Sequence, residues 1–269
     1  MFLAASLAAT LASVSFAQTP TTPAPAPAKP KVAAAPKTGA AAKPAASAYD
    51  RTLLKPSLLK DKAPDTYQVK FETTRGDFTV TCARAFSPLG ADRFYNLVRH
   101  HFYDDASFFR VVPNFVVQFG ISAYPPVTAA WSKATIKDDP RNQSNKKGTI
   151  TFATSGPNTR TTELFINLKD NPHLDAQGFT PFCAVDDKGM NVVEFLYDQY
   201  GDSAGMDQQA IEQGGKKYID TKWPKLDSLK HATLIGAAAT APATKPPAAK
   251  PATKPAATGA KPAAAPAKP

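Results

Sequence analysis

The chain has 269 residues and a formal net charge of +10, and fifteen of its 26 prolines lie in residues 18–48 and 237–269. Nearly all other residues in these two stretches are alanine, threonine or lysine, so there is almost no apolar surface to bury. This composition excludes them as folded domains, and we expect two extended, disordered spacers around one domain at residues 49–236.

The positive charge is concentrated in the two spacers. They contain nine lysines and no acidic residue, which leaves the domain with a net charge close to +1. Lysines dispersed among proline and alanine serve solubility and extension more often than binding. We therefore expect no nucleic-acid partner.

Residues 1–17 are predicted to be a signal peptide. They are uncharged, mostly small or apolar, and end in Ser15-Phe16-Ala17, with small residues at the two positions that signal peptidase reads. The run is shorter than the roughly 20 apolar residues that a membrane span needs, and serine and threonine interrupt it. We expect an exported protein, periplasmic or secreted, with no membrane span in the mature chain.

The domain begins with a predicted β-hairpin at residues 67–83, turning at residues 74–77. In its second strand Phe78, Val80 and Cys82 alternate and are expected to point inward. A helix should follow, with Ser87 as its N-cap and Pro88 in its first turn, ending near residues 103–105. Its apolar face is Phe94, Leu97 and Val98.

Further β-rich pieces recur at residues 107–119, 148–154, 163–168 and 180–185, and a second helix is predicted at about residues 190–200. Many short strands with two helices favour a mainly β fold, a closed or nearly closed antiparallel barrel plugged by helices, over a doubly wound sheet.

Two cysteines, Cys82 and Cys183, allow one disulfide in an oxidising compartment. Two separate buried thiols are almost equally compatible with the sequence, because free cysteine is common in protein cores. No metal site is expected, since the four histidines show no ligand spacing.

The chemistry is indicated by two segments, FFRVVPNFVVQFG at residues 108–120 and FATSGPNTRTTELFINL at residues 152–168. In this order and at this separation they resemble the cyclophilin family, and the resemblance extends over residues 67–235. Smaller matches include Gly76, Phe182 and the pair Leu174-Asp175. Variants at residues 89–94 and 178–182 are similar to those of a bacterial exported subgroup.

The resemblance implies a closed, eight-stranded antiparallel barrel capped by two helices, and a peptidyl-prolyl cis-trans isomerase that needs no cofactor. It implies that Arg110 donates a hydrogen bond to the prolyl nitrogen and that Gln118 positions Arg110. It also implies a substrate-binding set, with an apolar pocket for the proline ring and peptide-binding backbone near Thr154: Phe115, Val116, Thr154, Phe165 and Leu174.

Three departures from the family pattern bear on activity. His173 stands where many members have tryptophan, which implies weak cyclosporin binding, and we expect it at the pocket rim. Phe179 stands where members have a pocket histidine, so turnover should be modest. Glu163 replaces a common glutamine, either as a tolerated substitution or as a bias toward basic peptides.

The partners implied are proline-containing segments of unfolded proteins, and we expect a monomer. The rival hypothesis is a module that binds proline-containing segments as a chaperone with little turnover. Arg110 separates the two, because a pure binder needs the apolar pocket but not the guanidinium. A hydrolase is disfavoured, since the chain has no Gly-x-Ser-x-Gly motif.

Overall fold

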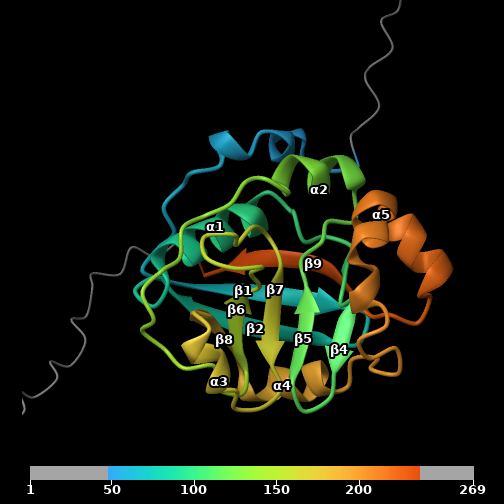
Figure 1. The fold of residues 1–269 in the computed structure, drawn as a ribbon. Helices are drawn as coiled ribbons and strands as arrows, with labels where there is room; N and C mark the ends of the chain where they lie inside the picture. The colour runs from blue at the N-terminus through green and yellow to red at the C-terminus, as the bar shows by residue number, and fades with distance from the viewer. Residues whose placement is uncertain (1–47, 237–269) are drawn as a thin grey trace, which may run out of the picture. The chain divides into compact units, whose positions relative to one another are not determined.

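Nine strands dominate the computed structural model, which describes residues 48–236 (Figure 1). The predicted signal peptide and C-terminal spacer, and the N-terminal spacer apart from Ala48, lie outside the described residues. The strands are β1 Thr66–Thr73, β2 Asp77–Ala83, β3 Ala106–Ser107, β4 Arg110–Val112, β5 Val116–Phe119, β6 Thr149–Phe152, β7 Leu164–Asn167, β8 Pro181–Val185 and β9 Ser228–Ile235. The α-helices are α1 Pro88–Arg99, α2 Pro125–Trp131, α3 His173–Ala176, α4 Asp187–Glu194 and α5 Gln208–Lys222. Short 3-10 helices are η1 Arg51–Leu54, η2 Pro56–Leu58 and η3 Gly205–Asp207.

All nine strands belong to one antiparallel sheet in the order β3-β9-β1-β2-β8-β6-β7-β5-β4. The expected closed barrel of eight strands is therefore corrected in two respects. Residues 106–112 form two strands, because Phe108 and Phe109 interrupt the ladder, and β3 pairs with the end of β9 as a ninth strand. Among the described strands no ladder joins β3 to β4, so the curled sheet is open and its two edges are linked by the chain itself.

The inner face of the sheet encloses the main core. Phe78, Val80 and Cys82 of β2 are all buried, as the alternation predicted. The apolar side of α1, including Phe94 and Leu97, packs into the same core. In Figure 1, α1 and α2 lie above the sheet and α3 and α4 below it.

Helix α1 ends earlier than predicted and is capped differently. His101 adopts a φ of 59°, which is incompatible with a continuing helix, so α1 stops at Arg99. Ser87 makes no side-chain cap; its hydroxyl donates to Asp139 instead. The Asp139 carboxylate accepts the amides of Leu89 and Gly90 at 3.0 and 2.9 Å, so a distant loop caps this helix.

The second predicted helix is α4, and it covers residues 187–194 rather than 190–200. Its N-cap is Asp186, whose side chain accepts the amide of Gly189 at 3.0 Å. Three α-helices, α2, α3 and α5, were not expected.

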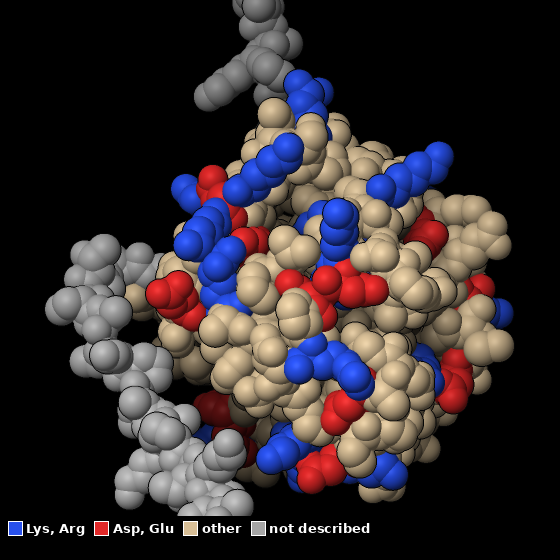
Figure 2. Space-filling view, turned by 60° about the vertical axis from the view of Figure 1, so that its left-hand side comes forward, with Lys and Arg blue, Asp and Glu red and all other residues tan. Residues whose placement is uncertain are grey.

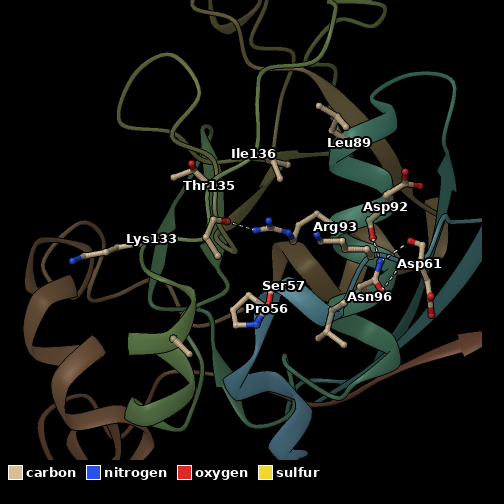
Figure 3. Close-up of a pocket in the computed structure, with 14 residues that line it drawn as sticks. Pro56, Ser57, Asp61, Leu89, Asp92, Arg93, Asn96, Lys133, Thr135 and Ile136 are labelled. Carbon is tan, nitrogen blue, oxygen red and sulfur yellow. Dashed lines mark hydrogen bonds between the residues drawn. The ribbon is translucent and has the colours of Figure 1, made fainter.

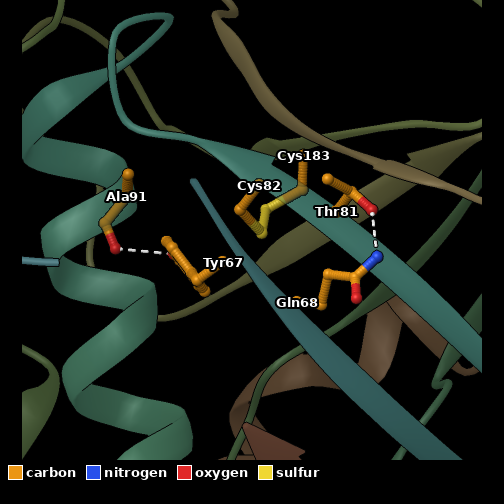
Figure 4. The surroundings of a disulfide bond; sticks show 6 residues. All are labelled: Tyr67, Gln68, Thr81, Cys82, Ala91 and Cys183. Carbon is orange, nitrogen blue, oxygen red and sulfur yellow. Dashed lines mark hydrogen bonds between the residues drawn. A yellow bond between two sulfur atoms is a disulfide. The ribbon is translucent and has the colours of Figure 1, made fainter. Parts of the chain in front are cut away.

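The two cysteines form a disulfide across the middle of the sheet (Figure 4). Cys82 of β2 and Cys183 of β8 are directly paired in the ladder and are buried. Beside them the hydroxyl of Tyr67 donates to the carbonyl of Ala91 at 2.8 Å, which ties β1 to α1. The bond joins residues 101 positions apart.

Basic and acidic side chains are interspersed over the face shown in Figure 2. Among residues 48–236, no helix has the length and apolar character required to cross a membrane.

Candidate active site

Arg110, Gln118 and Phe165 lie in one row across three neighbouring strands. Arg110 of β4 pairs with Gln118 of β5, which in turn pairs with Phe165 of β7. Directly paired residues of antiparallel strands project from the same face of a sheet. This is the face opposite to Val117 and Phe119, which are buried in the main core. The pairing therefore places the predicted catalytic pair beside a predicted pocket residue.

The turn between β4 and β5 brings Phe115 back toward Arg110. The amide of Phe115 donates to the carbonyl of Val112 at 3.0 Å, and Asn114 adopts the left-handed φ of 58° that this tight turn requires. The guanidinium carbon of Arg110 consequently lies 5.6 Å from the centre of the Phe115 ring. This distance is within the range of a cation–π contact.

The predicted pocket residues form a small apolar cluster separate from the main core, which we call the apolar patch. Its buried members are Val116, Phe165 and Leu174, and Phe115 and Phe179 pack at its margin together with Ala153. The rings of Phe179 and Phe165 meet edge to face, with their centres 5.4 Å apart. His173 is exposed, and its ring stacks on that of Phe115 with the ring centres 6.1 Å apart, which places it at the margin of the apolar patch.

Helix α3, which supplies His173 and Leu174 to the patch, is held in place by Asp175. The Asp175 carboxylate accepts hydrogen bonds from the Ser144 hydroxyl at 2.5 Å and from the Asn145 amide and side chain at 2.8 and 2.7 Å. Burial raises the pKa of Asp175, but these hydrogen bonds outweigh it and bring the pKa below its ordinary value. The charged carboxylate thus anchors the helix to the loop before β6.

Thr154 follows β6 at the edge of the patch. Its hydroxyl bonds to the Thr159 hydroxyl at 2.8 Å and donates to the carbonyl of Gly156, so the side chain stabilises its own loop. The preceding residue, Ala153, packs against the patch. The backbone near Thr154 therefore runs beside the predicted pocket, while the Thr154 side chain does not enter it.

A continuous chain of polar contacts runs through Arg110. The Nε of Arg110 donates to Oδ1 of Asp202 at 2.5 Å, and Nη1 lies 3.4 Å from Oε1 of Gln118. The Gln118 amide nitrogen donates to Glu163 at 2.9 Å. Gln208 of α5 lies 3.4 Å from the same Glu163 oxygen. Two carboxylates therefore flank the Arg110–Gln118 pair.

Glu163 titrates in an unusual range for a carboxylic acid. Burial raises the pKa of Glu163 to about 7, although the hydrogen bond from Gln118 lowers it, and the nearby Glu212 contributes a smaller rise. At neutral pH this group is consequently present in both its protonated and its ionised form.

Asp202 and Gln208 were not predicted as site residues. Asp202 lies 92 positions after Arg110, in a loop of ordinary polar composition. A single acid in such a loop carries no motif, so only the three-dimensional structure reveals it.

A cavity of about 570 Å³ lies elsewhere, between the N-terminal segment and helices α1 and α2 (Figure 3). Its lining includes Pro56, Leu89, Arg93, Lys133 and Ile136 and none of the predicted site residues. Arg93 points across it and donates to the carbonyl of Ala134. The candidate active site around Arg110 is thus separate from this cavity.

Comparison with known proteins agrees with the geometry. Residues 68–216 match the family model of cyclophilin type peptidyl-prolyl cis-trans isomerases. A peptidyl-prolyl cis-trans isomerase of Acinetobacter baylyi is 32% identical over 154 residues, covering 54% of this chain and 79% of the relative. Peptidyl-prolyl cis-trans isomerase B of Escherichia coli is 30% identical over 154 residues, covering 54% of this chain and 93% of the relative.

Among solved structures, a cyclophilin type peptidyl-prolyl cis-trans isomerase of Cryptosporidium parvum aligns with a TM-score of 0.46 and 18% identity, over 63% of this chain and 97% of that chain. The family assignment rests on the family model and the two relatives. The chain therefore belongs to the cyclophilin family, and it is a peptidyl-prolyl cis-trans isomerase.

Proposed function

We propose that the chain accelerates isomerisation of X-Pro bonds in exported proteins, with Arg110 as the catalytic residue. The observation that supports this role is the row formed by Arg110, Gln118 and Phe165, which sets a guanidinium beside the apolar patch.

The mechanism follows from the peptide bond. Rotation about an X-Pro bond breaks the conjugation of the amide and meets a barrier of roughly 18 to 20 kcal/mol. As conjugation is lost, the lone pair of the prolyl nitrogen becomes able to accept a hydrogen bond. A donor placed there binds the twisted state more strongly than either planar state, and this difference lowers the barrier.

Arg110 fits the role of that donor. A guanidinium stays protonated and presents several N–H groups in a fixed plane. Its Nη2 makes no hydrogen bond to any residue between 48 and 236, so this donor is open to a substrate. The reaction transfers no proton, and it requires neither a general base nor a cofactor.

The apolar patch would hold the proline ring. Val116, Phe165 and Leu174 form its floor, and Phe115 and Phe179 its margins. Gln118 would orient Arg110, and the backbone near Thr154 would bind the flanking peptide. The substrate class is therefore proline-containing segments of unfolded chains, bound by a monomer.

Export is supported by two features. The first seventeen residues have the composition of a signal peptide. The Cys82–Cys183 disulfide is a bond that persists in oxidising compartments. Both fit a folding catalyst of the periplasm or the medium.

The test is a protease-coupled isomerisation assay on a short X-Pro peptide. We expect Arg110→Ala to lower kcat/KM by about 100- to 1000-fold, the range found when one transition-state donor is removed. Arg99→Ala, which removes an exposed arginine paired with Asp61, is the matched control and should retain wild-type activity. Equal activity of folded Arg110→Ala and wild-type protein would refute the catalytic role and favour a proline-peptide binding module.

A further inference from the structure

We propose that Asp202 is a positioning residue for Arg110, and that the segment Gly201–Gly205 is the element that delivers it. The carboxylate of Asp202 holds the guanidinium by its Nε, and this sets the direction in which the Nη groups face a substrate. The inference rests on the proposed catalytic role of Arg110.

The contact geometry is the first support. The Nε of Arg110 donates directly to Oδ1 of Asp202, a hydrogen bond between a guanidinium and a carboxylate, which belongs to the stronger, charge-assisted class. Gln118 binds Nη1 at the longer distance of 3.4 Å, so Asp202 is the closer of the two partners. Arginine has a long flexible stem whose ordering costs up to about 2 kcal/mol of entropy. Two contacts at different nitrogens remove that freedom before substrate arrives, which is the requirement for a preorganised donor.

Gly205 provides a second and independent contact with the same side chain. A Cβ placed on Gly205 would lie 2.7 Å from Cδ and 3.0 Å from Cγ of Arg110. Only a residue without a side chain lets the segment lie directly on the stem of Arg110. The segment therefore touches Arg110 twice, by a charge at the head and by close packing along the stem.

The segment is anchored on both sides. Before it, the amide of Tyr197 donates to Asp227 at 2.8 Å, and the rings of Tyr197, Tyr200 and Trp223 meet in two edge-to-face contacts of 5.0 Å. After it, Asp207 accepts from Trp223 Nε1 at 3.3 Å.

Helix α5 also packs against the residue that precedes Arg110 and strand β4. Ile211 and Ile219 of α5 form a small buried cluster with Phe109 and Ile121. Phe109 directly precedes Arg110 in the chain. These contacts hold the backbone around Asp202 in position next to Arg110, although the Asp202 side chain is 57% exposed.

The decisive experiment separates turnover from binding. NMR exchange spectroscopy on an X-Pro peptide at rising concentration gives kcat and KM separately. We expect Asp202→Ala to lower kcat by about 3- to 10-fold and to leave KM within about twofold, because Asp202 holds the donor and lies outside the apolar patch. Asp202→Glu, which keeps the carboxylate, should restore most of the loss.

Asp198→Ala is the matched control, because Asp198 lies in the same loop and its side chain accepts a hydrogen bond from Gln199, whereas Arg110 hydrogen-bonds to Asp202 and Gln118. It should leave both constants unchanged. A second readout is independent of turnover: the Nε–Hε cross-peak of Arg110 should move upfield in Asp202→Ala and stay in place in Asp198→Ala.

The outcomes distinguish the two proposals. An unchanged or raised kcat in Asp202→Ala, or a loss that Asp198→Ala shares, would overturn the positioning role. An unshifted Nε–Hε cross-peak would overturn it without reference to activity. Failure of Arg110→Ala to reduce turnover would instead refute the catalytic role from which this inference starts.

Discussion

Glu163 places an ionisable group in direct contact with the Gln118 side chain. In the folded protein burial raises its pKa to about 7, whereas the ordinary value is 4.5. Between these values the native state holds a proton that the unfolded chain releases, so stability falls as pH rises. The contribution is fully present below pH 4.5 and is lost as pH rises through about 7.

Glu163→Gln removes this titration and should therefore stabilise the protein at high pH. We expect little difference from wild type at about pH 5 and a gain of roughly 1 to 3 kcal/mol at about pH 8. Urea unfolding of both proteins at the two pH values measures the difference in their free energies of unfolding. Glu194→Gln, which changes a carboxylate paired with Lys147 on the surface, is the control. A difference in the free energy of unfolding that is equal at both pH values would contradict the raised pKa of Glu163.

Single residues were predictable where a motif surrounds them. Arg110, Gln118 and the patch residues Phe115, Val116 and Phe165 stand within two continuous segments, and the strand register brings those segments together. Asp202 comes from a separate part of the chain and has no pattern of its own. Ser87 shows the converse case, because it has a cap residue's identity, yet Asp139 makes the cap from another loop.

At the level of elements, the kinked path of α5 requires glycine at position 215. This residue has a φ of 59° inside the helix, and a Cβ there would collide with the carbonyl oxygen of Ala123. The kink lets the amide of Lys216 donate to that same carbonyl at 2.9 Å, which joins α5 to the segment before α2. Helix α5 in turn carries Gln208 to Glu163.

Gly215→Ala should consequently destabilise the protein. A strained backbone and a steric clash act together, and we expect a loss of roughly 2 to 4 kcal/mol in the free energy of unfolding. Gly178→Ala is the matched control. Gly178 has a φ of 89°, but an added Cβ would meet no other atom there, so its loss in the free energy of unfolding should come from backbone strain alone. Hydrogen exchange should also show faster opening of α5 in Gly215→Ala. Equal losses for the two variants would argue against a clash at Ala123.

Local patterns explain which elements were foreseen. The hairpin β1–β2 combines alternation with a Gly-containing turn, and α1 has a proline in its first turn and a clear apolar face. Helix α5 contains Gly214-Gly215, which weakens any helical signal, and α2 is short and starts with two prolines. Tertiary packing against Phe109 and Ile121 stabilises α5 where local propensity does not.

For the whole molecule, the sequence indicated an antiparallel barrel-like sheet but not how its edges meet. Strand pairing is set by contacts between distant segments, such as β1 with β9. The two-residue strand β3 is too short to recognise from alternation, and it is formed only because β9 passes beside it. The number of strands and the open edge between β3 and β4 are therefore properties of the assembled sheet.

The disulfide acts at this same scale, because it closes a loop of about a hundred residues between β2 and β8. A disulfide between positions so far apart reduces the conformational freedom of the unfolded chain. We expect the bond to add about 2 to 4 kcal/mol to the free energy of unfolding. Wild-type protein should melt at a lower temperature after full reduction, whereas the Cys82→Ala/Cys183→Ala double variant should not respond to reductant. Because the bond lies in other strands than Arg110, isomerase activity at low temperature should survive reduction. If thiol titration shows complete reduction and the melting temperature is unchanged, the bond does not stabilise the fold.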